Sequence, residues 1–181
     1  VSYGLTAPST NEKVGPKFLR ITDIVPDVID WENVPYCKAD EKDIVRNRLQ
    51  PGDVVVARTG ATVGYAKLIT TLHHEAVYAS YLVRFKFNDS NISTIAGVYM
   101  ESDMYKEYVK NHAGGAAQPN ANAKILGSAT IFLPAESIRK QFGEKMTTIF
   151  KQKDFLIQQN GLLAQARDLL LPRLMSGEVA V

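Results

Sequence analysis

The sequence has 181 residues, of which 45% are hydrophobic, and its 21 Lys and Arg against 19 Asp and Glu give a net charge of +2. This length accommodates one ordinary domain and an appendage, and the hydrophobic fraction excludes a disordered chain. No apolar run approaches the ~20 residues of a membrane span, and the first residues lack the basic start and apolar core of a signal peptide. The single cysteine, Cys37, excludes an internal disulfide framework and fits a reducing cytoplasm, where we expect the protein to reside.

Positive charge is not concentrated in the first part of the chain. Residues 1–134 carry 14 Lys and Arg against 14 Asp and Glu, whereas residues 135–181 carry 7 against 5. A DNA-binding domain usually shows a stronger basic bias. If this chain binds DNA, its positive charge must be local, or a partner must supply much of the backbone affinity.

The N-terminal third predicts one strand between two irregular segments. Residues 1–16 are rich in Gly, Pro, Ser, Thr and Asn, which is typical of an extended, turn-containing entry. Residues 18–24 alternate apolar and polar side chains and predict a half-buried strand, without settling which face is buried. An acidic, loop-like segment follows around Trp31, with Asp27, Asp30 and Glu32, and it would repel a phosphate backbone unless it faces away from it.

Residues 51–67 form the most informative stretch. A Pro-Gly-Asp turn at 51–53 precedes a β-branched run at 54–56, which predicts a short buried strand. Arg58 and Thr59 then leave the strand where Gly60 and Gly64 allow the backbone to bend or to be approached closely. A cation and hydroxyl groups on such a loop suit an anion such as phosphate, although a hairpin whose arginine pairs with a carboxylate gives the same pattern. The loop matches neither the P-loop nor the dinucleotide-binding motif.

The middle of the chain predicts a strand, a helix and a second strand. Residues 77–87 alternate near their end and predict a strand, and residues 93–112 have a helical pattern with Ser93 as N-cap and a Gly-Gly stop at 114–115. Residues 116–124 form a loop with three amide side chains. Amides pair with adenine edges but are also ordinary turn residues. Residues 129–133 predict a last strand, ended by Pro134.

After Pro134 the pattern becomes that of one long helix. A single heptad row runs through it, while Lys153, Asn160 and Arg167 interrupt the second seam. We expect a helix over residues 136–171, roughly 50 Å long at ~1.5 Å per residue and ended by Pro172. One small domain cannot bury such a length, so a partner helix is favoured over a helix that folds back on its own domain. The residues of the row and of the flanking stripe expected to pair are Phe142, Met146, Ile149, Leu156, Leu163 and Leu170.

Residue patterns for catalysis are weak. Asp27, followed by Asp40 and Lys42, loosely matches a metal-nuclease pattern, but no predicted strand carries the second half. His73 and His74 are adjacent and would point to opposite faces of a strand. The sequence therefore argues against an enzyme, and we expect no catalytic or metal site.

Four stretches together resemble the specificity subunit of type I restriction-modification systems. They include the Ala-Arg-Thr-Gly motif at 57–60 and the Leu-Leu-Leu-Pro-Arg-Leu ending, and they appear in the family's order, followed by the expected long helix. The matching stretches are residues 15–24, 52–64, 114–122 and 169–178.

This resemblance implies an α+β fold with a division of labour. A globular, β-rich target-recognition domain (1–134) would read one half of a split site in double-stranded DNA. A long helical spacer (135–181) would pair as an antiparallel coiled coil with a second copy or a second recognition repeat. The chain itself would be non-catalytic and carry no cofactor, because the modification (methyltransferase) and restriction subunits would bring S-adenosylmethionine, ATP and Mg. Complete subunits hold two such repeats, so we expect this chain to be half of one.

The resemblance also assigns provisional roles. Family members that recognise different sequences share the motif at 57–60, so Arg58, Thr59 and Thr62 are expected to set the fold or hold the DNA backbone. Sequence choice is expected within residues 31–48 and 65–80. The DNA-binding candidates are Arg20, Thr22, Arg46, Arg48, Arg58, Thr59, Thr62, Tyr65, Lys67, His73, His74, Gln118, Asn120, Asn122 and Lys124.

Two alternatives remain open from the sequence. The balanced charge of residues 1–134, hereafter the head, would suit a coiled-coil assembly module whose globular part binds protein. The acidic residues would suit a magnesium-dependent nuclease. This alternative requires that the protein cleave plain DNA with magnesium and that Asp40→Ala abolish the cleavage.

Overall fold

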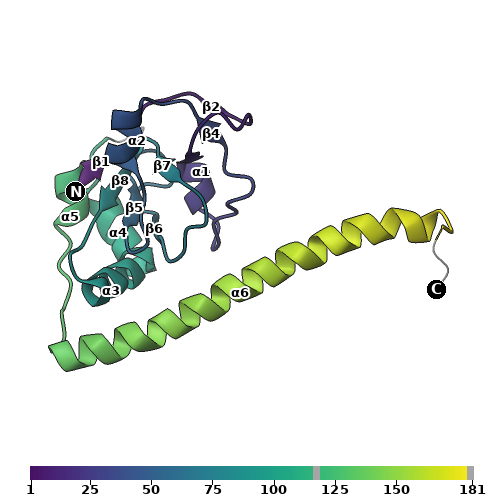
Figure 1. The fold of residues 1–181 in the computed structure, drawn as a ribbon. Coiled ribbons are helices and arrows are strands. Elements are labelled where there is room, and N and C mark those ends of the chain that lie inside the picture. The colour runs from purple at the N-terminus through teal and green to yellow at the C-terminus, as the bar shows by residue number, and fades with distance from the viewer. Residues whose placement is uncertain (116–118, 179–181) are drawn as a thin grey trace. The chain divides into compact units, whose positions relative to one another are not determined.

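The computed structural model of the protein describes residues 1–115 and 119–178. They fall into two compact units, Val1–Gly143 and Glu144–Val181. Small sheets and short helices occupy the first unit, and the second is the continuation of one long helix (Figure 1). The expected α+β class is thereby confirmed. The domain boundary at residue 134 stays a prediction.

The elements of the described residues follow in chain order. The strands are β1 (Ser2–Tyr3), β2 (Ser9–Thr10), β3 (Lys17–Leu19), β4 (Tyr36–Cys37), β5 (Val54–Ala57), β6 (Ala66–Leu68), β7 (Ala76–Tyr78) and β8 (Leu82–Phe85). The helices are α1 (Ile21–Ile24), α2 (Glu41–Asn47), α3 (Ser90–Glu101), α4 (Asp103–His112), α5 (Ala123–Gly127) and α6 (Glu136–Met175).

The first sheet has the strand order β1-β8-β5-β6, and all its pairs are antiparallel. The predicted strand at 54–56 is confirmed as β5, whose four residues are all buried. Val55 and Ala57 lie in the main core cluster with Leu82 of the neighbouring β8. Helix α3 packs against β6 and β5, where Gly97 lets it approach so closely that a Cβ would stand 2.9 Å from Leu68.

The second sheet has the order β2-β4-β3-β7, with β3 and β7 parallel. The strand predicted over 18–24 is wrong beyond Leu19, because the carboxylate of Asp23 accepts hydrogen bonds from the backbone and the guanidinium of Arg20 and so starts the turn of α1. On β3 the side chain of Leu19 joins the main core, and that of Phe18 joins a second cluster with Cys37. Burial raises the pKa of the Cys37 thiol, which suits a packed, unreactive side chain.

The single strand predicted over 77–87 is also wrong. The chain makes a turn there, closed by the Leu82 N–H, which donates to the Ala79 carbonyl at 2.9 Å. Strand β7 before the turn belongs to the second sheet, and β8 after it belongs to the first. The two sheets are therefore connected directly at residues 79–82.

The helix predicted over 93–112 is two helices. Asp89 caps α3 by accepting the N–H groups of Asn91 and Ile92, while Ser102 ends α3 and caps α4. Ser93, the predicted N-cap, is buried inside α3 and donates its hydroxyl to the Gly52 carbonyl. The internal N-cap Ser102 thus divides into two helices a pattern that periodicity alone presents as continuous.

Residues 129–133, predicted as a last strand, have no regular structure. They pair with no strand among the described residues, and Phe132 is 84% exposed. A short apolar run without a strand edge to bond its backbone stays irregular.

Helix α6 begins at Glu136, as predicted, but runs past Pro172 to Met175. Proline removes one backbone donor, yet the helix tolerates that loss three residues before its end. It ends instead in a glycine-terminated motif, with Gly177 at φ 73°. The N–H of Glu178 donates to the Arg173 carbonyl, and that of Gly177 to the Leu174 carbonyl. Within the described parts of the chain, no helix is both long and apolar enough to cross a bilayer.

Lys17 is the most buried cation of the core, with 3% of its surface exposed. Its ammonium donates to the carbonyls of Glu32 (2.9 Å) and Val34 (2.8 Å) and lies 4.2 Å from the centre of the Tyr36 ring. It thereby fixes the end of the acidic loop against β3. A charged donor with two carbonyl acceptors can compensate for its own desolvation.

We predict that Lys17→Met lowers the free energy of unfolding by about 1–3 kcal/mol, because the buried Val34 carbonyl and the partly buried Glu32 carbonyl lose their donor. Urea denaturation measures the change, and Lys38→Met, at an exposed position after β4, should have little effect. An equally or more stable Lys17→Met variant would show that desolvation of the ammonium outweighs its hydrogen bonds.

Candidate nucleic-acid interface

Arg58 stands where β5 ends and a tight loop begins. Gly60 and Gly64 adopt φ 78° and 86°, which lets the chain reverse within the loop. The Gly64 N–H donates to the Ala57 carbonyl at 2.9 Å, and the Tyr65 N–H donates to the Thr62 carbonyl at 3.0 Å. Strands β5 and β6 therefore form a hairpin, and Arg58 is the first residue of its loop.

A segment distant in sequence is paired with this loop. The Ala121 N–H donates to the Arg58 carbonyl at 2.8 Å, and the Gly60 N–H donates to the Pro119 carbonyl at 3.0 Å. Thr59 and Asn120 are thereby opposed in a short antiparallel bridge. The side-chain oxygen of Asn120 lies 3.5 Å from Nη2 of Arg58. The structure thus joins two of the stretches that carry the family resemblance.

The charge of Arg58 is not matched by a carboxylate. Among the described residues no acidic side chain forms an ion pair with Arg58, and its Nε is buried without a hydrogen-bond partner. Its guanidinium lies 5.0 Å from the ring of Tyr3, whose hydroxyl in turn accepts the Ala123 N–H at 3.0 Å. The hairpin interpretation with a paired arginine is therefore not what the structure shows. A half-buried guanidinium without a counter-ion suits an incoming anion.

The other amide and basic candidates nearby have simpler roles. Asn122 is the N-cap of α5, and its side-chain oxygen accepts the Ile125 N–H at 2.9 Å. Lys124 is exposed on that helix, and Gln118 lies outside the described residues. Of the predicted amides in this loop, the structure places Asn120 beside Arg58.

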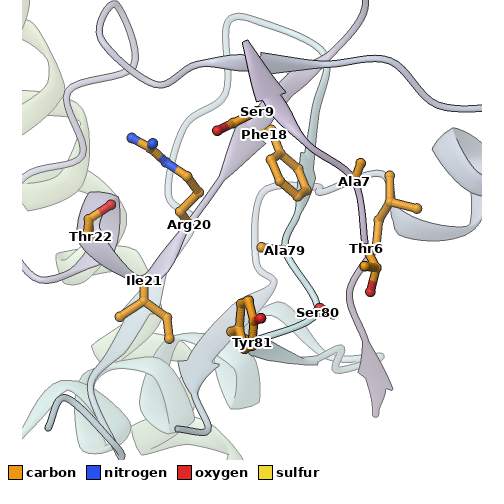
Figure 2. A pocket seen from close by; sticks show the side chains of 11 residues that line it. Thr6, Ala7, Ser9, Phe18, Arg20, Ile21, Thr22, Ala79, Ser80 and Tyr81 are labelled. Atoms are coloured by element: carbon orange, nitrogen blue, oxygen red, sulfur yellow. The ribbon is translucent and has the colours of Figure 1, made fainter. Parts of the chain in front are cut away.

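A hollow of about 400 Å³ lies beside the Arg58 loop. Figure 2 shows Phe18, Ile21 and Tyr81 around it, with Arg20 and Thr22 on one side and Thr6 and Ala7 on the other. The Tyr81 carbonyl accepts the Arg58 N–H at 3.0 Å, so the wall of the hollow continues into the loop. Arg20 is fixed there by Asp23, and this hydrogen bond raises the pKa of Arg20.

Tyr65 and Lys67 follow the loop but are engaged elsewhere. The ammonium of Lys67 lies 3.6 Å from Glu101 and donates to the Asp27 carbonyl at 3.2 Å, and only 12% of its side chain is exposed. The ring of Tyr65 packs against the main core beneath the ammonium of Lys106 at 4.8 Å.

The remaining candidates lie on other elements. Arg46 and Arg48 lie at the end of α2, and their main-chain carbonyls accept hydrogen bonds from the guanidinium of Arg84. The Arg48 side chain forms an ion pair with Glu75. Both predicted histidines are exposed, and His74 lies 3.6 Å from a carboxylate oxygen of Glu32. The predicted set is thus dispersed rather than gathered in one cluster.

The acidic residues of the nuclease hypothesis do not show a shared site. Asp40 stands at the N-cap position of α2 without a side-chain capping hydrogen bond, Lys42 lies in the first turn of α2, and Asp27 lies in an irregular segment. Within residues 1–115 and 119–178, no group of three His, Cys, Asp or Glu side chains is placed to hold a metal ion.

Two aromatic residues of this surface escaped the sequence analysis. Tyr3 lies in an entry segment without periodicity, and Tyr81 lies in a turn that lacks Gly, Pro, Asn or Asp. Both are exposed, Tyr3 to 43% and Tyr81 to 60%. Only their adjacency to Arg58 distinguishes them, and that adjacency is tertiary.

The chain is similar to two curated specificity subunits. It is 22% identical to the type I restriction enzyme EcoKI specificity subunit of Escherichia coli (strain K12), over 97% of this chain and 40% of the relative. It is 23% identical to the type I restriction enzyme HindI specificity subunit of Haemophilus influenzae, over 90% of this chain and 35% of the relative. The predicted resemblance is confirmed, and the chain spans about two fifths or less of these relatives' length.

A solved structure shares the fold. A chain from work on complex assembly and conformational transition of the type I R-M system superposes with a TM-score of 0.54 at 17% identity, over 95% of this chain and 42% of that chain. No family model matches the sequence.

The glycines of the Arg58 loop should differ in their tolerance of alanine. We expect Gly60→Ala to cost about 1–2 kcal/mol from its left-handed backbone alone, since no atom lies within 4 Å of the added Cβ. Gly64→Ala should cost more, because its Cβ would also stand 2.9 Å from Cβ of the buried Val109.

Gly114→Ala is the matched control, with open space and no positive φ, and should be nearly neutral. Urea denaturation ranks the three variants. Equal losses for Gly60→Ala and Gly64→Ala would contradict the packing of the loop against α4.

Proposed function

We propose that this chain is the sequence-specific DNA-recognition part of a type I restriction-modification complex and reads one half of a bipartite target. The observation that carries the proposal is the pairing of residues 58–60 with residues 119–121, which holds Arg58 beside Asn120 without a carboxylate partner. The similarity to specificity subunits supports it.

Arg58 has the geometry of a backbone contact. Its loop is fixed by main-chain hydrogen bonds, and a guanidinium without a counter-ion is suited to a phosphate. Asn120, whose amide can bridge a donor and an acceptor on adenine, lies beside Arg58, and we propose that it contacts a base edge near that phosphate. We therefore assign Arg58 to affinity for the DNA backbone, and Asn120 to a role between backbone contact and base readout.

The engaged basic residues modify the expected pattern of base readout. Lys67 is largely buried and paired, and Arg48 is paired with Glu75. Within the stretches proposed to choose the sequence, Arg46, Arg48, His73 and His74 are all exposed, although His74 also lies 3.6 Å from a carboxylate oxygen of Glu32. We place base readout on such exposed side chains rather than on Lys67.

The neutral head implies that the chain acts with partners. Since phosphate contacts dominate affinity for DNA, a balanced charge within residues 1–134 leaves much of that affinity to other subunits. We propose that modification subunits supply it together with the methyltransferase site, and that restriction subunits act through the same complex. S-adenosylmethionine, ATP and Mg then bind those partners, and this chain is non-catalytic.

Helix α6 is proposed to pair with a second copy or a second recognition repeat. The row residues Ile149, Leu156, Leu163 and Leu170 are each at least 50% exposed, whereas Phe142 and Met146 are half-buried. A helix of 40 residues is about 60 Å long at ~1.5 Å per residue, which would span more than one turn of DNA. Such a helix could separate two recognition domains by a fixed distance.

We predict that Arg58→Ala, in the complex with its modification subunit, weakens binding to target and non-target duplexes alike by roughly tenfold. The slope of log K against log salt should fall by about 0.9, the value for one phosphate contact. Fluorescence anisotropy over a salt series measures both effects.

Lys86→Ala is the matched control. Lys86 follows β8 at the end of the sheet away from Arg58, as the pairing of Ala57 with Leu82 and of Val54 with Phe85 shows. Its loss should change neither affinity nor slope. A changed preferred sequence for Arg58→Ala would contradict the assignment, and salt-insensitive or absent DNA binding by the wild-type complex would favour a protein-binding assembly module.

Cysteine cross-linking tests the helix pairing, because the single native cysteine is buried. Leu156 is the middle residue of the heptad row. In an antiparallel pair of identical helices, every residue of the row has a partner only if Leu156 faces Leu156 of the other copy and Ile149 faces its Leu163. Leu156→Cys should then form a disulfide-linked dimer under mild oxidation, whereas Ile149→Cys alone should not.

Gln165→Cys, on the opposite face of α6, is the negative control. Cross-linking of both Ile149→Cys and Leu156→Cys would indicate a parallel pair. A monomeric protein without any cross-link would show that the partner helix comes from a different chain.

A further inference from the structure

Tyr81 occupies the turn where the chain passes between the two sheets. Before it, β7 pairs with β3, and after it β8 pairs with β1 and β5. The turn places an aromatic residue between the hollow and the Arg58 loop. Nothing in the assigned roles above uses this residue.

The backbone around Tyr81 is held from both sides. The Ser80 N–H donates to the Leu5 carbonyl at 2.8 Å, and the Tyr81 carbonyl accepts the Arg58 N–H at 3.0 Å. The Leu82 N–H closes the turn on the Ala79 carbonyl. The main chain is therefore fixed, although the side chain of Tyr81 is exposed.

The side chain is presented without internal partners. Tyr81 is 60% exposed, and among the described residues its hydroxyl has no hydrogen-bond partner. By contrast, the hydroxyl of Tyr78 bonds to Ser2 and that of Tyr105 to the Leu126 carbonyl. A tyrosine on a fixed backbone loses little conformational entropy on binding and offers both an apolar face and a polar tip.

The surroundings match a nucleic acid. The floor of the hollow is apolar, with Phe18, Ile21 and Ala79, and its edge carries the hydroxyl groups of Thr6, Thr22 and Ser80. Arg58 lies opposite Tyr81, because the β5–β8 register pairs Ala57 with Leu82 and the Arg58 main-chain N–H donates to the Tyr81 carbonyl. The Arg58 guanidinium, beside the Tyr3 ring and Asn120, has no carboxylate partner among the described residues. An anionic backbone on Arg58 would thus bring adjoining bases toward the Tyr81 ring.

We propose that Tyr81 is a specificity-determining residue, whose ring packs on a base while its hydroxyl bonds to a base edge, with the hollow receiving an apolar group such as a thymine methyl. The inference rests on the proposed DNA-recognition function. It adds a position outside the stretches 31–48 and 65–80 to which the sequence assigned base choice. The shared motif then fixes the position of a reading residue rather than reading bases itself.

The test is the methylated motif made in cells that express the full chain with the modification subunit of its own system. Single-molecule sequencing of host DNA reports the motif, and anisotropy of the purified complex reports affinity. Tyr81→Phe should relax one motif position, lowering discrimination there by about 5- to 100-fold, the range of one base contact. Tyr81→Ala should relax the same position and also weaken binding.

Phe132→Ala is the matched control, because Phe132 is an exposed aromatic residue of the same unit that does not line the hollow. It should leave the motif unchanged. An unchanged motif with Tyr81→Ala overturns the inference, as does an equal loss of affinity for all sequences, which would mark a backbone contact. Tyr81→Phe retains the ring and every main-chain bond, so misfolding cannot account for its result.

Two further outcomes separate this inference from the proposed function. If Tyr81→Ala prevents association with the modification subunit, the hollow receives a protein side chain and the inference fails. If the wild-type complex forms but neither methylates nor binds any motif, the proposed function fails before Tyr81 is at issue.

Discussion

The proposed recognition surface depends on a two-bond ladder between segments about sixty residues apart. The Arg58 carbonyl accepts the Ala121 N–H, and the Gly60 N–H donates to the Pro119 carbonyl. Without this ladder the guanidinium of Arg58 would lie on a free loop tip, where side-chain entropy opposes any fixed contact. With it, the cation, the Asn120 amide and the Tyr3 ring share one rigid surface. The left-handed glycines of the loop are needed because the strand must turn and still offer its backbone to that ladder.

The turn at residues 79–82, where the chain passes from one sheet to the other, also stabilises that surface. A single sheet would carry residues 76–85 in one direction and bury alternate side chains. Because β7 and β8 belong to different sheets, the turn between them projects outward and is held by Leu5 on one side and Arg58 on the other. Rigid backbone with an exposed aromatic side chain is a preorganised arrangement for binding. The same turn gives the main core its continuity, since Tyr78 and Leu82 lie in one cluster.

Strong local patterns predicted their elements, and weaker ones were overruled by side-chain hydrogen bonds. The β-branched run at 54–56 and the heptad row of α6 needed no tertiary information. Asp23, by contrast, turned an alternating stretch into α1, and Ser102 divided a helical one. Pro172 did not end α6, because the three residues beyond it keep helical geometry until Gly177 adopts a positive φ. In each case a single residue decided where the helix or strand ended, and a periodic pattern over many residues does not reveal the effect of one residue.

The residues of the proposed site were predictable only where the family resemblance supplied them. Arg58 and Asn120 lay in matching stretches, whereas Lys67 was chosen by charge alone and proved to be paired with Glu101. Counts of charged residues do not reveal which of them form ion pairs. The equal numbers of basic and acidic residues in 1–134 therefore do not show which cations lack a counter-ion. What matters for an anionic ligand is a cation without a counter-ion, and Arg58 meets that condition among the described residues. Under the proposed function, this neutral domain would position DNA for reading while partner subunits supply the long-range attraction that its own composition lacks.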